Sequence, residues 1–117
     1  MSTLKSMKDA ILLLARGDLK NVEAVLSELK FKVNSDRERG YLKALEGITL
    51  SLRKDSPNLY ARMVSSMDCK EIDREIEIIR RNFLEKPPFL RDEFQEGFFT
   101  CILDFMKALS NNRRIKD

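Results

Sequence analysis

The chain has 117 residues, of which 43% are hydrophobic and 35% charged, and its formal net charge is +3 at pH 7. This length suits one compact domain, and no apolar run approaches the roughly 18 residues needed to cross a bilayer. Histidine is absent, which excludes catalytic dyads and triads built on imidazole and removes the commonest metal ligand. We therefore expect a single domain with no membrane span and no cofactor.

Two cysteines, Cys69 and Cys101, lie far apart in segments with helical periodicity and outside any metal-ligand spacing. Cys101 falls in an apolar stripe and is expected to be buried, whereas neighbouring Asp68 disfavours a reactive thiolate at Cys69. No N-terminal stretch has the basic start and apolar core of a secretory signal, so we expect a cytoplasmic protein. Gln95 is the single glutamine of the chain, and such scarcity of glutamine is typical of proteins from hot-growing organisms.

The spacing of apolar residues indicates the fold class. Apolar residues recur three and four positions apart nearly everywhere and almost never alternate, which predicts an all-α fold. The expected architecture is an antiparallel bundle of five to six helices joined by short turns. Residues 1–110 are predicted to form this single helical domain, and residues 111–117 a basic, frayed tail.

The first predicted helix begins near Thr3 and ends at Gly17, which can adopt the left-handed conformation that suits a helix end. Its inward stripe consists of Leu4, Met7, Ile11 and Leu14. Asp18 is the predicted N-cap of a second helix. The inward residues of that helix are Val22, Val25, Leu26, Leu29 and Val33. Both helices should bury one face and leave the other in water.

The third helix is predicted to start at a capping box, in which Ser35 and Glu38 bond reciprocally to first-turn amides. It carries an apolar stripe of Tyr41, Leu45, Ile48 and Leu52, and a second stripe of small residues, Gly40, Ala44, Gly47 and Ser51. A glycine inside a helix costs roughly 1 kcal/mol relative to alanine. We expect close backbone packing to offset this cost, and therefore place the third helix at the centre, touched on two sides.

Three further helices follow. Ser56-Pro57 predicts a fourth helix, with proline at its first position, whose inward residues are Leu59, Met63, Val64 and Met67. Asp68 and Glu71 repeat the cap signal for a fifth helix, with Ile72, Ile76, Ile79 and Phe83 inward, which ends before Pro87-Pro88. The last helix has the strongest apolar stripe, formed by Phe94, Phe98, Cys101, Ile102, Phe105 and Leu109.

An internal repeat is one interpretation of this pattern. A shift of 37 residues gives six identities in 14 aligned positions, pairing Ile11 with Ile48, Leu13 with Leu50, Arg16 with Arg53, Asp18 with Asp55, Asn21 with Asn58 and Ala24 with Ala61. This supports two related helical hairpins in a solenoid-like arrangement. Gly17-Asp18-Leu19 also resembles the turn of a tetratricopeptide unit, but the aromatic and proline positions of that family are absent. Similar cap chemistry at two helix ends explains the same likeness without a repeat.

The last helix is the sharpest functional feature, because Phe99 lies off the main stripe and makes the helix apolar on two sides. Such a helix is either buried between two others or meets a partner. The candidate interface residues are Phe94, Phe98, Phe99, Ile102, Phe105 and Met106. The first hypothesis is therefore a non-catalytic helical module that binds protein, as a homodimer or as a small subunit of a larger assembly.

The basic residues suggest a second hypothesis, an RNA- or DNA-binding accessory subunit of a nucleoprotein complex. The candidate contacts are Arg80, Arg81, Arg113, Arg114 and Lys116. Tyr41 and Tyr60 are the aromatic residues expected to reach solvent for stacking. Cations near helix C-termini also complement the helix dipole, which explains Arg80 and Arg81 without a ligand.

A metal-dependent nucleotide hydrolase is the least favoured alternative. Glu93-x-x-Glu96 has the spacing that all-α nucleotide pyrophosphatases use, but no second acidic motif follows it. Acidic residues at a helix start also complement the helix dipole. We therefore assign no catalytic residue, no metal ligand and no cofactor.

Overall fold

A computed structural model describes residues 3–53, 66–84 and 92–116, and for residues 4, 83, 84 and 113–116 it describes the backbone alone. The helices are α1 (Thr3–Arg16), α2 (Leu19–Lys32), α3 (Asp36–Leu52), α5 (Cys69–Ile79) and α6 (Glu93–Lys116), and a π-helical turn, η1 (Arg80–Leu84), continues α5. These ranges contain no strand, so the predicted all-α class is confirmed. The predicted fourth helix, apart from Met67, and Pro87-Pro88 lie outside the described residues.

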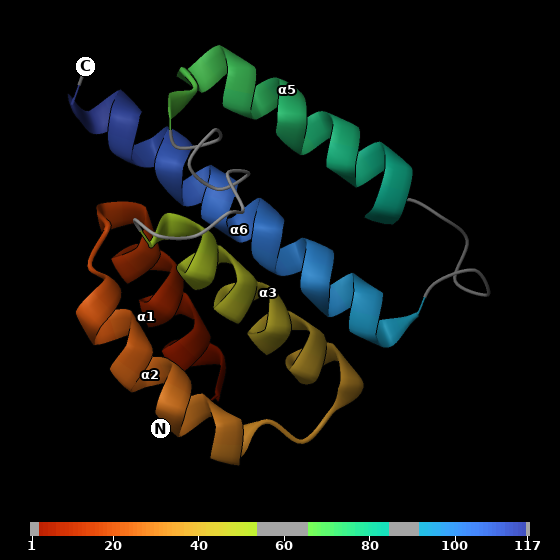
Figure 1. The fold of residues 1–117 in the computed structure, drawn as a ribbon. Helices are drawn as coiled ribbons and strands as arrows, with labels where there is room; N and C mark the ends of the chain where they lie inside the picture. Colours follow the sequence, from red (N-terminus) through yellow and green to blue (C-terminus); the bar gives the residue numbers. More distant parts are fainter. Residues whose placement is uncertain (1–2, 54–65, 85–91, 117) are drawn as a thin grey trace.

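The long last helix is the element around which the others are arranged. It lies between α3 and α5 and also contacts α1 (Figure 1). Helices α1, α2 and α3 alternate in direction, but α6 runs parallel to α3 and antiparallel to α5 (Figure 1). The expected antiparallel arrangement is therefore wrong for α3 and α6, which form the most extensive helix contact of the described chain. The reason is that α5 returns the chain toward the start of α3 before α6 begins.

The turn between α1 and α2 follows the predicted chemistry. Gly17 has a φ of +78°, a conformation that glycine adopts without the steric cost of a side chain. The carboxylate of Asp18 accepts hydrogen bonds from the Asn21 amide at 3.3 Å and from Asn21 Nδ2 at 2.7 Å. The predicted N-cap of α2 is confirmed.

The caps of α3 and α5 differ in one detail. Ser35 Oγ accepts from the Glu38 amide at 3.1 Å, but the Glu38 carboxylate accepts from the Asn34 amide at 3.0 Å and not from that of Ser35. The predicted reciprocal box at α3 is therefore shifted by one residue on its second bond. At α5 the box is complete, with Asp68 accepting from the Glu71 amide at 2.9 Å and Glu71 accepting from the Asp68 amide at 3.4 Å.

The α5 cap gives a first prediction. Asp68→Ala should lower the free energy of unfolding by about 1 kcal/mol, because the first-turn amide of Glu71 loses its acceptor. Asp68→Ser is the matched control, since its hydroxyl can accept the same bond, and it should recover most of the loss. Urea denaturation followed by circular dichroism measures both variants, and an equal loss in the two would contradict the cap argument.

The core is built from the predicted inward stripes. Its largest members include Leu14 of α1, Val22 and Leu29 of α2, Leu45 of α3 and Ile72 of α5, each 2% exposed or less. Val25, Val33 and Leu52 were expected to face inward and are only half-buried. The central positions of these stripes are therefore buried, and edge positions such as Val25 reach solvent.

Two glycines allow the backbones of α3 and α6 to approach closely. A methyl group on Gly40 would lie 2.8 Å from the carbonyl carbon of Phe94 and closer still to its oxygen. A methyl group on Gly97 would meet the carbonyl group of Arg37 at the same distance. The two parallel backbones therefore touch at a crossing that only glycine permits. Gly47 is exposed with open space around it, so the expected close packing of this glycine is wrong.

The C-terminal segment and the predicted repeat are only partly described. Helix α6 continues to Lys116, so residues 111–116 are helical, and fraying of this segment in solution stays a prediction. Ile11 and Ile48 are both buried, but Asp55, Asn58 and Ala61 lie outside the described residues, so the internal repeat also stays a prediction. No helix in the described part of the chain is long and apolar enough to span a membrane.

Candidate protein-binding surfaces

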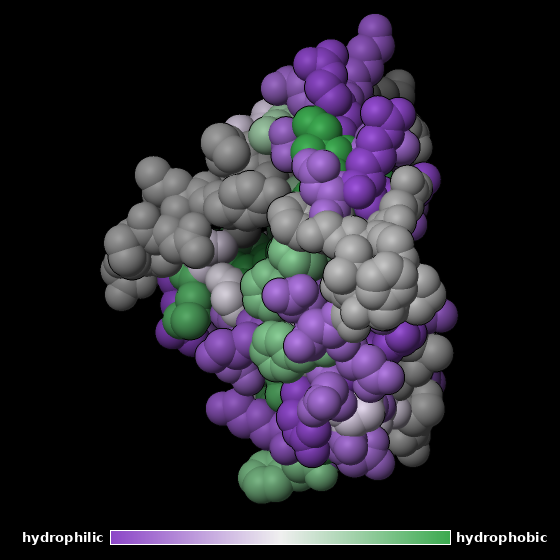
Figure 2. Space-filling model, turned by 90° about the vertical axis from the view of Figure 1, so that its right-hand side faces the viewer, coloured by the Kyte–Doolittle hydropathy of each residue, from purple (hydrophilic) through white to green (hydrophobic). Residues whose placement is uncertain are grey.

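The predicted interface on α6 is divided between surface and core. Phe94 is 38% exposed, and Phe98, Phe99 and Ile102 are half-buried at the edge of the core. The rings of Phe98 and Phe99 pack edge to face, with centroids 5.5 Å apart. Hydrophobic side chains gather over the first turns of α6 between charged neighbours (Figure 2). We call Phe94, Phe98, Phe99 and Ile102 the α6 stripe.

The other two predicted interface residues belong to the core. Phe105 is 2% exposed and Met106 is fully buried. They lie near the middle of α6, where the helix has α3 on one side and α5 on the other. A pattern of apolar residues on two sides of a helix is what two covering neighbours require. Phe105 and Met106 are therefore core residues of this chain, and their contact with a partner stays a prediction.

The basic candidates are only partly described. Arg80 and Arg81 lie on η1, and their guanidinium groups approach opposite oxygens of the Glu77 carboxylate at 3.6 and 3.5 Å. One carboxylate thus offsets part of the charge of both arginines. The side chains of Arg113, Arg114 and Lys116 lie outside the described residues. Tyr41, which was expected to reach solvent for base stacking, is only 8% exposed, so this expectation is wrong.

The acidic candidates lie at the start of α6. Asp92 accepts hydrogen bonds from the amides of Phe94 and Gln95 at 2.7 and 3.2 Å and thereby caps the helix. Glu96 forms an ion pair with Arg37 of α3 at 3.2 Å. No group of three or more acidic or cysteine side chains in the described ranges could hold a metal ion. The carboxylates therefore act, in this part of the chain, as a cap and as a link between helices.

The two cysteines occupy different environments. Cys101 is fully buried, as predicted, and burial, followed by the nearby Asp104 carboxylate, raises the pKa of its thiol. The thiol of Cys69 is half-buried and donates a weak hydrogen bond to the carbonyl oxygen of Ser110, with sulfur and oxygen 3.6 Å apart. Both thiols therefore contribute to the packing of α6.

A groove that the sequence did not predict lies between α1 and α6. It is a pocket of about 340 Å³ lined by Lys8, Ile11, Leu12, Tyr41, Asp104, Lys107, Ala108, Asn111 and Asn112. Leu12 is 47% exposed, although it is a large apolar residue in the middle of α1. This exposed leucine was the available signal, because Leu12 lies off the inward stripe of its own helix. We call this pocket the α1–α6 groove.

A buried polar pair borders the groove. The Tyr41 hydroxyl donates a hydrogen bond to the Asp104 carboxylate at 2.6 Å and joins α3 to α6. Burial raises the pKa of Tyr41 far above its usual range, and Cys101 and Asp104 raise it further. Because Tyr41 already occupies one oxygen of Asp104, the carboxylate is partly satisfied inside the protein.

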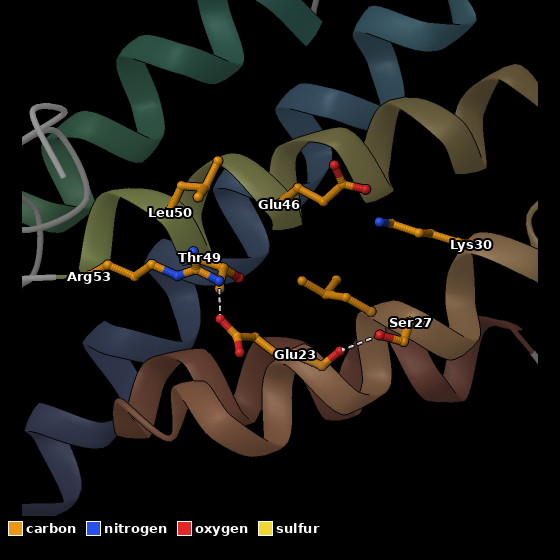
Figure 3. A pocket seen from close by; sticks show the side chains of 8 residues that line it. Glu23, Ser27, Lys30, Glu46, Thr49, Leu50 and Arg53 are labelled. Atoms are coloured by element: carbon orange, nitrogen blue, oxygen red, sulfur yellow. Dashed lines mark hydrogen bonds and ion pairs between the residues drawn. The ribbon is translucent and has the colours of Figure 1, made fainter. Parts of the chain in front are cut away.

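A second pocket, of about 290 Å³, lies between α2 and α3 (Figure 3). At one end Arg53 forms an ion pair with Glu23, and at the other Lys30 and Glu46 face each other across the opening (Figure 3). Both members of the Arg53–Glu23 pair are nearly half exposed, so water screens their attraction and the pair stabilises the fold little. With two cations and two carboxylates around it, this pocket favours neither sign of ligand charge.

Comparison of the chain with protein-family models, with curated proteins and with solved structures finds no match.

Proposed function

We propose that this chain is a non-catalytic helical module that works by binding another protein chain. The observation that carries the proposal is the α6 stripe. Phe94, Phe98 and Ile102 follow one another at four-residue spacing along α6, and none of them is buried. Large aromatic side chains on one line of a helix are typical anchors of protein interfaces. The stripe is therefore the proposed contact surface.

The chemistry of the rest of the molecule supports binding over turnover. Histidine is absent from the sequence. Of the two cysteine thiols, one is fully buried and the other is engaged with a backbone carbonyl. Asp92 and Glu96, which open α6, are engaged by amides and by Arg37. The predicted internal repeat, with two related hairpins, is compatible with this proposal, because helical repeats commonly present binding surfaces.

The predicted basic candidates whose side chains are described give the nucleic-acid hypothesis no specific support. Arg80 and Arg81 share the Glu77 carboxylate, and buried Tyr41 offers no face for a base. A polyanion surface needs cations that are free to displace counterions from phosphate. We therefore keep protein binding as the proposal and make nucleic-acid binding an outcome of its test.

Phe94→Asp tests the proposal. We expect this variant to weaken partner binding by about tenfold or more, because it places a charge in an apolar contact. The full chain is immobilised, proteins from the native host are passed over it with and without nuclease, and retained proteins are identified by mass spectrometry. Light scattering at tens of micromolar determines whether the partner is a second copy of the chain.

Phe31→Asp is the matched control, because it makes the same substitution at a phenylalanine that is 92% exposed on α2, a helix that packs on α1 and α3. The control should retain the partner that Phe94→Asp loses. Loss of binding after nuclease treatment would assign the chain to nucleic acid. A monomer that retains no protein, or equal retention by both variants, would contradict the proposed surface.

A further inference from the structure

The α1–α6 groove combines an apolar interior with a rim on which, among the described lining residues, two lysines stand against one carboxylate. Ile11 and Ala108 form its buried wall, and Leu12 stands at its edge, 47% exposed. A pocket of about 340 Å³ can hold an apolar side chain such as leucine or phenylalanine together with its neighbours on a helix. The lining residues come from α1 and α6, with Tyr41 from α3.

The cations of the groove come from both of its walls. Lys8 projects from α1 and Lys107 from α6, both side chains are exposed, and neither forms an ion pair with a described residue. Among the described lining residues the one carboxylate is Asp104, which is half-buried and accepts a hydrogen bond from the hydroxyl of buried Tyr41 at 2.6 Å. With two lysines and one carboxylate, the described lining has a net positive charge, and a lysine stands on each wall of the groove.

This distribution of charge selects a class of partner. A helix laid in a groove is held by apolar residues three and four positions apart, and its flanking residues meet the rim. Carboxylates at the flanking positions would lie near Lys8 and Lys107, whereas lysines there would be repelled. The second pocket, between α2 and α3, lacks this asymmetry, because it holds two carboxylates and two cations.

We propose that the α1–α6 groove binds an acidic amphipathic helix of a partner protein, with an apolar anchor against Ile11, Leu12 and Ala108 and with carboxylates beside Lys8 and Lys107. This inference rests on the proposed function, because it also assigns a protein partner to α6. It concerns the side of α6 that faces α1 and does not involve the α6 stripe.

A synthetic helical peptide of about 14 residues, or four turns, is the probe. Its leucines are three and four positions apart on one face and its other positions are glutamate and alanine, and a second peptide has lysine in place of glutamate. Fluorescence anisotropy with the full chain should show tighter binding of the acidic peptide, weakening as salt is added. The double variant Lys8→Glu, Lys107→Glu should bind the acidic peptide about tenfold more weakly than wild type. It should bind the lysine peptide more tightly than wild type does.

Two controls separate this groove from the general charge of the protein and from the α6 stripe. Lys20→Glu with Lys43→Glu reverses the same number of charges at exposed lysines on α2 and α3 and should leave peptide affinity within about twofold of wild type, because these charges lie outside the groove. Phe94→Asp should bind the peptide normally, so that failure here is distinguishable from failure of the proposed function. Leu12→Ala should weaken the binding of both peptides, because it removes apolar contact area. The affinity for the acidic peptide should fall about fivefold.

Several outcomes would overturn the proposal. Equal affinity of wild type for the acidic and the lysine peptides would show that the lysines of the rim do not select the partner. An equal loss with the Lys20 and Lys43 reversals would show attraction to net charge alone. Binding of decanoate to the full chain without binding of either peptide would assign the groove to a small amphipathic acid. A homodimer dissociated by the Lys8 and Lys107 reversals would assign it to a second copy of the chain.

Discussion

Replacing Gly97 by alanine is expected to lower the free energy of unfolding by about 3 kcal/mol, the upper end of the usual range for overpacking. The added methyl group would collide with the backbone carbonyl of Arg37, and Gly40→Ala would collide with that of Phe94. Because the obstacle is backbone and not the end of a flexible side chain, α3 and α6 must separate to relieve it. That separation would weaken the most extensive helix contact of the described chain.

Gly47→Ala is the internal control for this prediction. It lies on the same helix as Gly40, but nothing is within contact distance of the position that its methyl group would occupy. Alanine has the higher helix propensity, so we expect Gly47→Ala to raise the free energy of unfolding by about 1 kcal/mol. Urea denaturation of the three variants gives the comparison. A loss of stability in Gly47→Ala would contradict the close backbone contact of α3 and α6. So would unchanged stability in both Gly40→Ala and Gly97→Ala.

Local signals in the sequence predicted local structure well. Asp18 and Asp68 cap their helices as expected, because a cap depends on residues within one turn of each other. Inward stripes identified Leu14, Leu29 and Ile72 as core residues, since a helix that packs on one neighbour buries one stripe. These features need no knowledge of how the helices are arranged.

The features that were missed depend on contacts between distant segments. The parallel contact of α3 and α6 requires a small residue on each helix, Gly40 on α3 and Gly97 on α6. The small residues of α3 were recognised from the sequence, but Gly97 was not. The bond between Tyr41 and Asp104 joins residues 63 positions apart, and each taken alone looked like an ordinary stripe or surface residue. An apolar pattern likewise does not specify which neighbour covers it, which is why part of the predicted interface proved to be core.

The stability of the protein should fall steeply above about pH 9, because two buried acids keep their protons in the folded state. Burial raises the pKa of Tyr41 and of Cys101, and neighbouring Asp104 raises both further. In the unfolded chain these groups lose their protons near their ordinary pKa values, about 8.5 for a thiol and about 10 for a phenol. The stability that their protonated forms contribute is therefore complete below these values and is lost as the pH rises through and above them.

Each group should remove about 1.4 kcal/mol of unfolding free energy per pH unit above its ordinary pKa, which amounts to about 4 to 5 kcal/mol for the pair at pH 11. Urea denaturation between pH 6 and 11 measures this dependence. Cys101→Ala should delay the decline until about pH 10, and Tyr41→Phe should halve the slope above that pH, because only one titrating group then remains. Tyr41→Phe should also lose about 1 kcal/mol at neutral pH, since Asp104 loses its donor. A variant with both substitutions that declines as steeply as wild type would show that these two protons do not control the alkaline limit of the fold.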